Sequence, residues 1–129
     1  MKRMISTFAC AFAMLMLTNI PAQAQANLNF LGTLQRDQPW HVDLDNSNNL
    51  APAAVTIFYL GKTLDFDIFT VAGATSFTVG DSKFPRGIRR IIIEVSVPRG
   101  MSVAVLVIQG GTGFSHPCTD GCRLALDIN

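Results

Sequence analysis

The chain has 129 residues, with ten Lys and Arg, nine Asp and Glu, and a formal charge of +1. Two of the ten basic residues precede residue 27 and all nine acids follow it, so the rest of the chain has a formal charge of −1. This balance excludes a nucleic-acid-binding protein, which needs surplus basic side chains to neutralise phosphates. The length after residue 26 suits one domain and is too short for two.

The first residues have the organisation of a secretory signal peptide. A short basic head precedes the uncharged, mostly apolar run 4–17, and small residues then alternate with glutamine. These are the three parts of an export signal. We predict a signal peptide over residues 1–26, cleaved after Ala26 or alternatively after Ala24, and a single domain over 27–129.

Two other interpretations of this segment are open. An uncleaved anchor helix needs about 20 consecutive apolar residues, and the run here is shorter. A lipoprotein would be anchored through Cys10, but most of the apolar region follows that residue. We therefore expect an exported protein, periplasmic or secreted, with no membrane span in the mature chain.

From residue 27 onward the dominant hydrophobic period is two, which is typical of half-buried strands. No later stretch of ten or more residues has helical periodicity. The pattern predicts about eight short strands, at 28–34, 40–44, 54–60, 63–70, 76–79, 88–97, 101–109 and 122–128. So many short strands with closely spaced turns predict an all-β fold, a small antiparallel β-sandwich of the Ig-like or jelly-roll-like kind.

The end of the second predicted strand and the loop after it are rich in carboxylate and amide oxygens. Asp43, Asp45 and Asn49 are candidate calcium ligands, since Ca²⁺ prefers such oxygens. The loop lacks the central glycine and the closing glutamate of an EF-hand. The alternative is a solvated turn whose side chains bind the nearby backbone.

Two aromatic and two acidic side chains are further candidates for chemistry. Trp40 and Tyr59 would suit sugar stacking, but both belong to the apolar sets of their strands and are expected in the core. Asp65 and Asp67 have a spacing that paired-carboxylate hydrolysis could use. They alternate with Leu64, Phe66 and Ile68, so we expect the acids to face solvent and the apolar side chains to face the core.

Four basic residues close to one another form a candidate anion-binding site. They are Lys83, Arg86, Arg89 and Arg90. Such a cluster could hold a sulfated glycan, a phosphate or an acidic lipid surface. The alternative is that these charges keep a loop and a strand end soluble and prevent edge pairing.

The segments 91–97 and 101–108 carry apolar residues on both faces, which indicates a central pair of strands or a face that meets a partner. The candidate partner patch consists of Ile92, Ala104, Leu106 and Ile108. An exposed apolar patch usually binds another protein or a second copy.

Cys118 and Cys122 are the only cysteines after residue 26, and a disulfide is expected in an exported protein. A three-residue hairpin with Gly121 left-handed would place them opposite each other. The alternatives are a metal site that includes His116, a redox-active pair and two free thiols. The favoured prediction contains no metal and no cofactor.

We therefore predict an exported, non-enzymatic module that binds a protein partner or itself. The first alternative is a module that binds a glycan, an anion or calcium. The second is a small secreted hydrolase, for which His41 or His116 would have to lie in a cleft with a shifted pKa.

Overall fold

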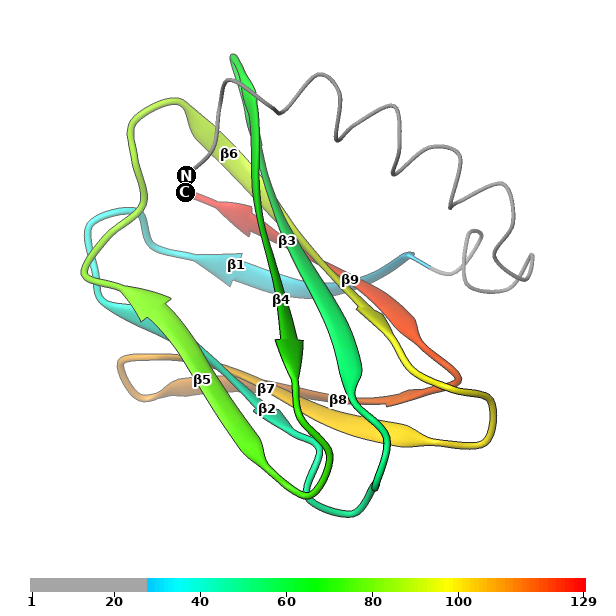
Figure 1. The fold of residues 1–129 in the computed structure, drawn as a ribbon. Helices are drawn as coiled ribbons and strands as arrows, with labels where there is room; N and C mark the ends of the chain where they lie inside the picture. The colour runs from blue at the N-terminus through cyan, green and yellow to red at the C-terminus, as the bar shows by residue number, and fades with distance from the viewer. Residues whose placement is uncertain (1–27) are drawn as a thin grey trace.

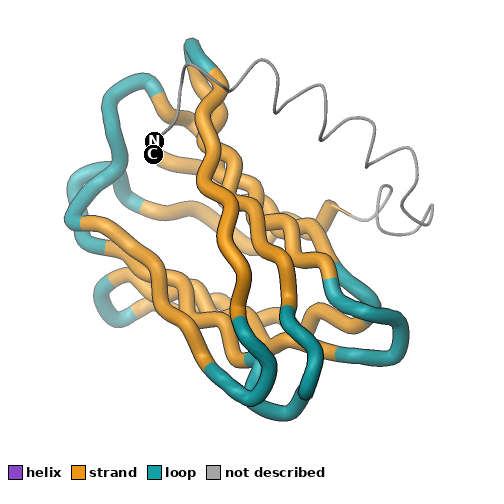
Figure 2. The backbone as a smooth tube through the Cα atoms, viewed as in Figure 1, coloured by secondary structure: helices purple, strands orange, loops and turns teal. Residues whose placement is uncertain are grey.

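The computed structural model describes residues 28–129, which form two layers of strands (Figures 1 and 2). The nine strands are β1 (Leu28–Leu34), β2 (Trp40–Asp45), β3 (Ala53–Gly61), β4 (Leu64–Val71), β5 (Ser76–Asp81), β6 (Ile88–Ser96), β7 (Ser102–Gln109), β8 (Thr112–Thr119) and β9 (Cys122–Ile128). Sheet A has the order β1-β9-β6-β3-β4 and sheet B the order β5-β2-β7-β8. The predicted β-sandwich is confirmed. The predicted signal peptide lies outside the described residues.

Strand pairing departs from the prediction in two respects. All pairs are antiparallel except β1 with β9, which run parallel at one edge of sheet A. The expected central pair β6 and β7 is not a pair, because β6 lies inside sheet A and β7 inside sheet B. Each of these strands needs a buried inner face, and crossing between the layers gives each strand one. Within residues 28–129 no helix forms that is long and apolar enough to cross a membrane.

Strand β8 was not predicted. Its sequence contains Gly113 and Pro117 and has weak hydrophobic alternation. Pairing with β7 nevertheless extends along the whole strand, from Gln109 beside Thr112 to Ser102 beside Thr119. Proline is tolerated here because β8 is the edge of its sheet.

The predicted orientation of β4 was wrong. Asp65 is 2% exposed, whereas Ile68 is 64% exposed. The register with β3 explains the reversal, since Asp65 lies beside Tyr59 and Asp67 beside Ile57, both of which point into the core. The pairing with β3 therefore determines which face of β4 is buried, and that face is opposite to the one that its own hydrophobic pattern predicts.

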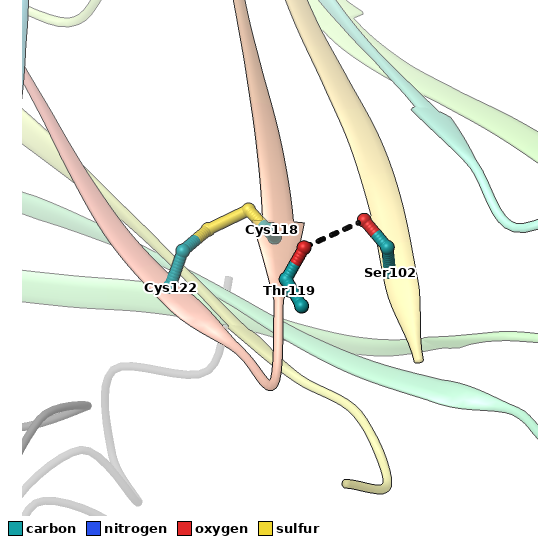
Figure 3. Close-up of a disulfide and its surroundings, with 4 residues drawn as sticks. All are labelled: Ser102, Cys118, Thr119 and Cys122. Carbon is teal, nitrogen blue, oxygen red and sulfur yellow. Dashed lines mark hydrogen bonds between the residues drawn. A yellow bond between two sulfur atoms is a disulfide. The ribbon is translucent and has the colours of Figure 1, made fainter. Parts of the chain in front are cut away.

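The disulfide between Cys118 and Cys122 is confirmed, with both cysteines buried and their Cα atoms 5.0 Å apart. The predicted hairpin is wrong, because β8 belongs to sheet B and β9 to sheet A (Figure 3). Asp120 and Gly121 turn the chain with φ values of 61° and 96°. The disulfide therefore joins the two sheets directly at one end of the sandwich.

An aromatic side chain packs at each of the two open sides of the sandwich. Between β1 and β8, the ring of Phe114 packs so closely on Gly32 that a Cβ there would lie 2.5 Å from it. Between β4 and β5, the rings of Phe69 and Phe77 meet with their centroids 5.1 Å apart. The second contact covers only part of its side.

Candidate functional site

A cleft of about 360 Å³ lies between β4 and β5, past the Phe69–Phe77 contact. Asp65 and Asp67 reach it from β4, and Val79 to Asp81 reach it from β5. The remaining walls come from Trp40 of β2, Tyr59 of β3 and the two loops that follow β3 and β5. This recess is the candidate functional site.

One carboxylate of the cleft accepts a hydrogen bond from the Tyr59 phenol, and two more act on it through their charge. Tyr59 donates a hydrogen bond from its hydroxyl to Oδ2 of Asp67, with 3.0 Å between the oxygens. Burial above all, and then the negative charges of Asp67, Asp81 and Asp65, raise the pKa of Tyr59 above its ordinary value. The phenol is therefore a hydrogen-bond donor at every physiological pH.

Three basic side chains offset the three carboxylates. Lys62 follows β3, and Lys83 and Arg86 follow β5; all three are exposed and line the cleft. The six charges sum formally to zero. The cleft therefore offers donors and acceptors in similar number without a net field for a strongly charged ligand.

Trp40 forms part of the wall with its polar edge unsatisfied. It is 4% exposed, and its ring stacks on Phe84 with centroids 4.6 Å apart and planes 9° from parallel. This confirms the core interpretation of Trp40 and leaves no open platform for sugar stacking. Its indole Nε1 is buried and meets no acceptor in the described part of the chain. Buried donors are nearly always paired, so a buried water is expected there.

The structure divides the predicted anion-binding cluster. Lys83 and Arg86 line the cleft, whereas Arg89 is exposed outside it. Arg90 lies on the outer face of sheet A, where its Nε is 2.8 Å from Oδ1 of Asp127. Only half of the cluster therefore belongs to the candidate site.

The candidate calcium residues are occupied by the chain itself. Asp43 Oδ1 accepts a hydrogen bond from Thr78, and Asp45 Oδ1 accepts one from the backbone N–H of Ser47. Asn49 uses Nδ2 to donate to Asn46 Oδ1 and to the Ser102 carbonyl. These hydrogen bonds connect the turn to itself and to strands β5 and β7.

Buried Asn46 organises that turn and was not singled out from the sequence. Its Nδ2 donates to the carbonyls of Ala51, Val71 and Ala72 at 3.0 to 3.2 Å. Three carbonyls from two segments therefore converge on one side chain, which holds this end of the sandwich together.

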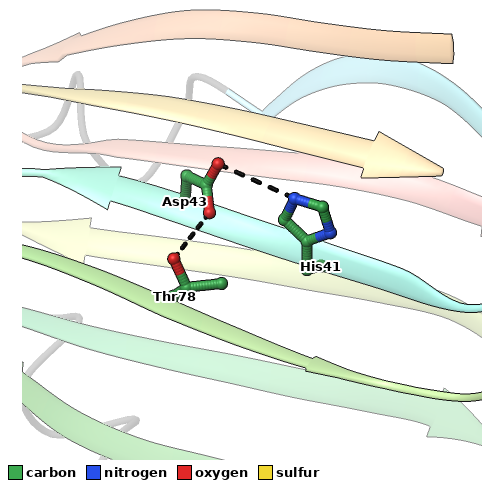
Figure 4. Close-up of polar contacts among 3 residues, drawn as sticks. All are labelled: His41, Asp43 and Thr78. Atoms are coloured by element: carbon green, nitrogen blue, oxygen red, sulfur yellow. Dashed lines mark hydrogen bonds and ion pairs between the residues drawn. The ribbon is translucent and has the colours of Figure 1, made fainter. Parts of the chain in front are cut away.

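His41 and Asp43 form a second polar group, on the outer face of sheet B (Figure 4). His41 Nε2 lies 3.7 Å from Asp43 Oδ2, and Thr78 donates to Oδ1 of the same carboxylate at 2.7 Å. A nucleophilic triad needs the hydroxyl bonded to the imidazole, and here the hydroxyl is bonded to the carboxylate. The group is a polar contact on an open sheet face.

The predicted partner patch is also divided. Ile92 lies in β6 of sheet A, and the other three residues lie in β7 of sheet B. All four point away from the core, but the two outer faces are on opposite sides of the sandwich. The structure therefore does not bring Ile92 together with Ala104, Leu106 and Ile108.

Among residues 28–129, one group of three side chains is compact enough to hold a metal ion, and it consists of His116, Cys118 and Cys122. Their ligand atoms lie within 4.8 Å of one another. The two sulfurs are bonded to each other, so neither is a thiolate ligand. The structure therefore favours the disulfide over the metal alternative.

Comparisons with known proteins add no family to this description. No protein-family model, curated protein or solved structure matches the chain. The fold and the geometry of the cleft define a nine-stranded β-sandwich with one polar recess at its β4–β5 edge.

Proposed function

We propose that this chain is an exported, non-enzymatic binding module whose cleft holds a short neutral saccharide or a ligand with similarly dense hydroxyl groups. The observation that carries the proposal is the balanced charge of the cleft, in which three carboxylates and three basic side chains line one recess beside Trp40 and Tyr59. The signal-like N-terminal sequence and the Cys118–Cys122 disulfide support export, because disulfides persist in oxidising compartments.

The chemistry of the cleft suits hydroxyl groups better than a strongly charged ligand. Each hydroxyl both donates and accepts a hydrogen bond, so it can use the carboxylates as well as the basic side chains. A polyanion would meet the three acids that surround Tyr59, and a polycation would meet the three bases. The volume of about 360 Å³ lies near the lower end of small-molecule sites, which favours a short ligand.

Fluorescence titration tests this proposal directly, because Trp40 is the only tryptophan. Short neutral oligosaccharides, and sulfated forms of the same sugars, are titrated against the protein. A neutral sugar is expected to shift or quench Trp40 emission. Arg86→Ala is expected to weaken binding at least tenfold. Arg89→Ala is the matched control, since Arg89 is exposed nearby and does not line the cleft.

Three results would contradict this function, and two of them would establish another. One result is that sulfated sugars bind and neutral sugars do not, and that this binding is lost at high salt and in both arginine variants. It would establish the anion-binding alternative. Cleavage of a sugar, abolished by Asp65→Asn in a folded variant, would establish the hydrolase alternative. The absence of any fluorescence or calorimetric response to every neutral sugar would refute saccharide binding.

A further inference from the structure

A continuous row of apolar side chains crosses the outer face of sheet A. The register places Phe30 beside Ala125, Ala125 beside Ile92, Ile92 beside Phe58, and Phe58 beside Phe66. We call these five residues the apolar row. Phe30 is 57% exposed, Ile92 and Phe58 are partly exposed, and the other two lie nearly buried at its floor. The row crosses all five strands of the sheet.

A mixed row runs along each side of the apolar row. The Ile68 row consists of Leu28, Arg123, Glu94, Thr56 and Ile68. The Leu64 row consists of Thr33, Asp127, Arg90, Leu60 and Leu64. Each mixed row therefore has an ion pair in its middle and an exposed aliphatic residue on edge strand β4.

We propose that this face binds the same face of a second copy of the chain, about a two-fold axis that runs along the apolar row. Rotation by 180° about this line places every residue of the apolar row against its own counterpart. The same rotation exchanges the mixed rows, so exposed Ile68 lies over exposed Leu64 of the second copy. An interface of this type is isologous, as two-fold dimers require.

The charges of the mixed rows are complementary under this rotation. Arg123 of β9 comes to lie over Asp127 of the second copy, and Glu94 of β6 comes to lie over Arg90 of the second copy. Both placements are attractive, and each occurs twice in the dimer. The polar residues of the face therefore select the same arrangement as its apolar residues.

Other two-fold axes fit the face less well. An axis parallel to the strands through β6 would place Glu94 against its own copy and Arg90 against its own copy, which is repulsive. A parallel axis between β6 and β9 would pair opposite charges. It would, however, leave Ile68 and Leu64 of β4 without apolar contacts on the second copy.

The size of the face predicts a weak dimer. Strands spaced about 4.8 Å apart and rows separated by a two-residue step of about 6.8 Å give a footprint of roughly 500 Å² per copy. The total of about 1,000 Å² is at the lower limit for a specific interface. We expect a dissociation constant in the micromolar range.

Sedimentation velocity tests the proposal at protein concentrations across the micromolar range. The sample is the protein in the form present after any processing in the cell. The expected result is a reversible monomer–dimer equilibrium. Ile68→Glu is expected to raise the dissociation constant at least tenfold, because the residue occurs twice in the interface. Ala104→Glu is the matched control, since Ala104 is exposed on the outer face of sheet B.

A charge exchange tests the position of the axis. Arg90→Glu alone is expected to weaken the dimer, because it places two carboxylates opposite each other. Adding Glu94→Arg is expected to restore association, since these two positions oppose each other only about the proposed axis. Thermal melts of dilute protein verify that both variants fold.

Three results would overturn the proposal. The first is a strict monomer up to several hundred micromolar. The second is disruption by Ala104→Glu but not by Ile68→Glu, which would assign self-association to sheet B. The third is a folded double variant of Arg90 and Glu94 that remains as weak as Arg90→Glu.

Discussion

Reduction of the Cys118–Cys122 disulfide is predicted to lower the free energy of unfolding by about 2 kcal/mol. The two cysteines are only four positions apart, so the bond closes a small ring. For so short a ring, the chain-entropy expression gives about 2 kcal/mol at 25 °C. Reduction removes no heavy atom from the buried site, so the change isolates the effect of the cross-link.

Urea unfolding of oxidised and reduced protein measures this difference, with circular dichroism and Trp40 fluorescence as probes. With a slope of about 2 kcal/mol/M, the midpoint is expected to fall by about 1 M. Cys118→Ala/Cys122→Ala should unfold at still lower urea, because it also loses the packing of two buried sulfurs. The double variant should be insensitive to reductant, which makes it the control.

An unchanged midpoint after complete reduction, verified by alkylation and intact mass, would refute this reasoning. It would mean that the direct link between β8 and β9 adds no constraint beyond the two-residue turn Asp120-Gly121. A response of the alanine variant to reductant would show that the reductant acts elsewhere in the protein.

Three further predictions concern single side chains. Phe84→Ala should lower the free energy of unfolding in urea by about 3–5 kcal/mol, because it removes a buried ring stacked on Trp40. An equal loss in Phe84→Tyr, which keeps the ring, would contradict this origin. Gly32→Ala should cost about 1–3 kcal/mol and less in a Phe114→Leu background, since its Cβ would press on the ring of Phe114. Burial raises the pKa of Glu94 although an arginine on β9 opposes the shift, so its ionised form is the less stable one in the fold. Glu94→Gln should therefore raise the free energy of unfolding of dilute, monomeric protein at neutral pH. This gain over wild type should shrink as the pH falls through the raised pKa toward the ordinary value of 4.5.

Local alternation was sufficient to predict the fold class, and it failed where pairing with a neighbour decided the structure. The inward residues of β2 follow their own pattern, from Trp40 to Leu44. Strand β4 carries an equally clear pattern, yet Asp65 is inside and Ile68 outside because the register with β3 aligns the acids with inward-facing residues. No local pattern records that register.

The cysteine pair shows the same limit. Cysteine spacing and the expected export were enough to predict the bond between Cys118 and Cys122. The same spacing suits a hairpin, and only the assignment of β8 and β9 to different sheets shows that the bond crosses the sandwich.

The cleft could be anticipated only in parts. Lys83 and Arg86 stood out as basic residues, and Trp40 and Tyr59 as aromatic ones. Their assembly with Asp81 depends on which edge strands of the two sheets lie together across the sandwich. That adjacency joins segments distant in sequence, and hydrophobic periodicity carries no information on it.

Strand β4 contributes to both proposed sites, and this makes their coupling measurable. Its inward residues Asp65 and Asp67 line the cleft, while its outward residues Leu64 and Ile68 lie on the dimer face. The strand pairs with β3 alone, and edge strands with one neighbour open most easily. A ligand that holds β4 in place should therefore favour the dimer, and linkage requires the dimer to strengthen ligand binding by the same factor. Titration of Trp40 at protein concentrations below and above the dimer's dissociation constant measures that factor. Equal affinities at both concentrations would show that β4 is already fully ordered in the free monomer.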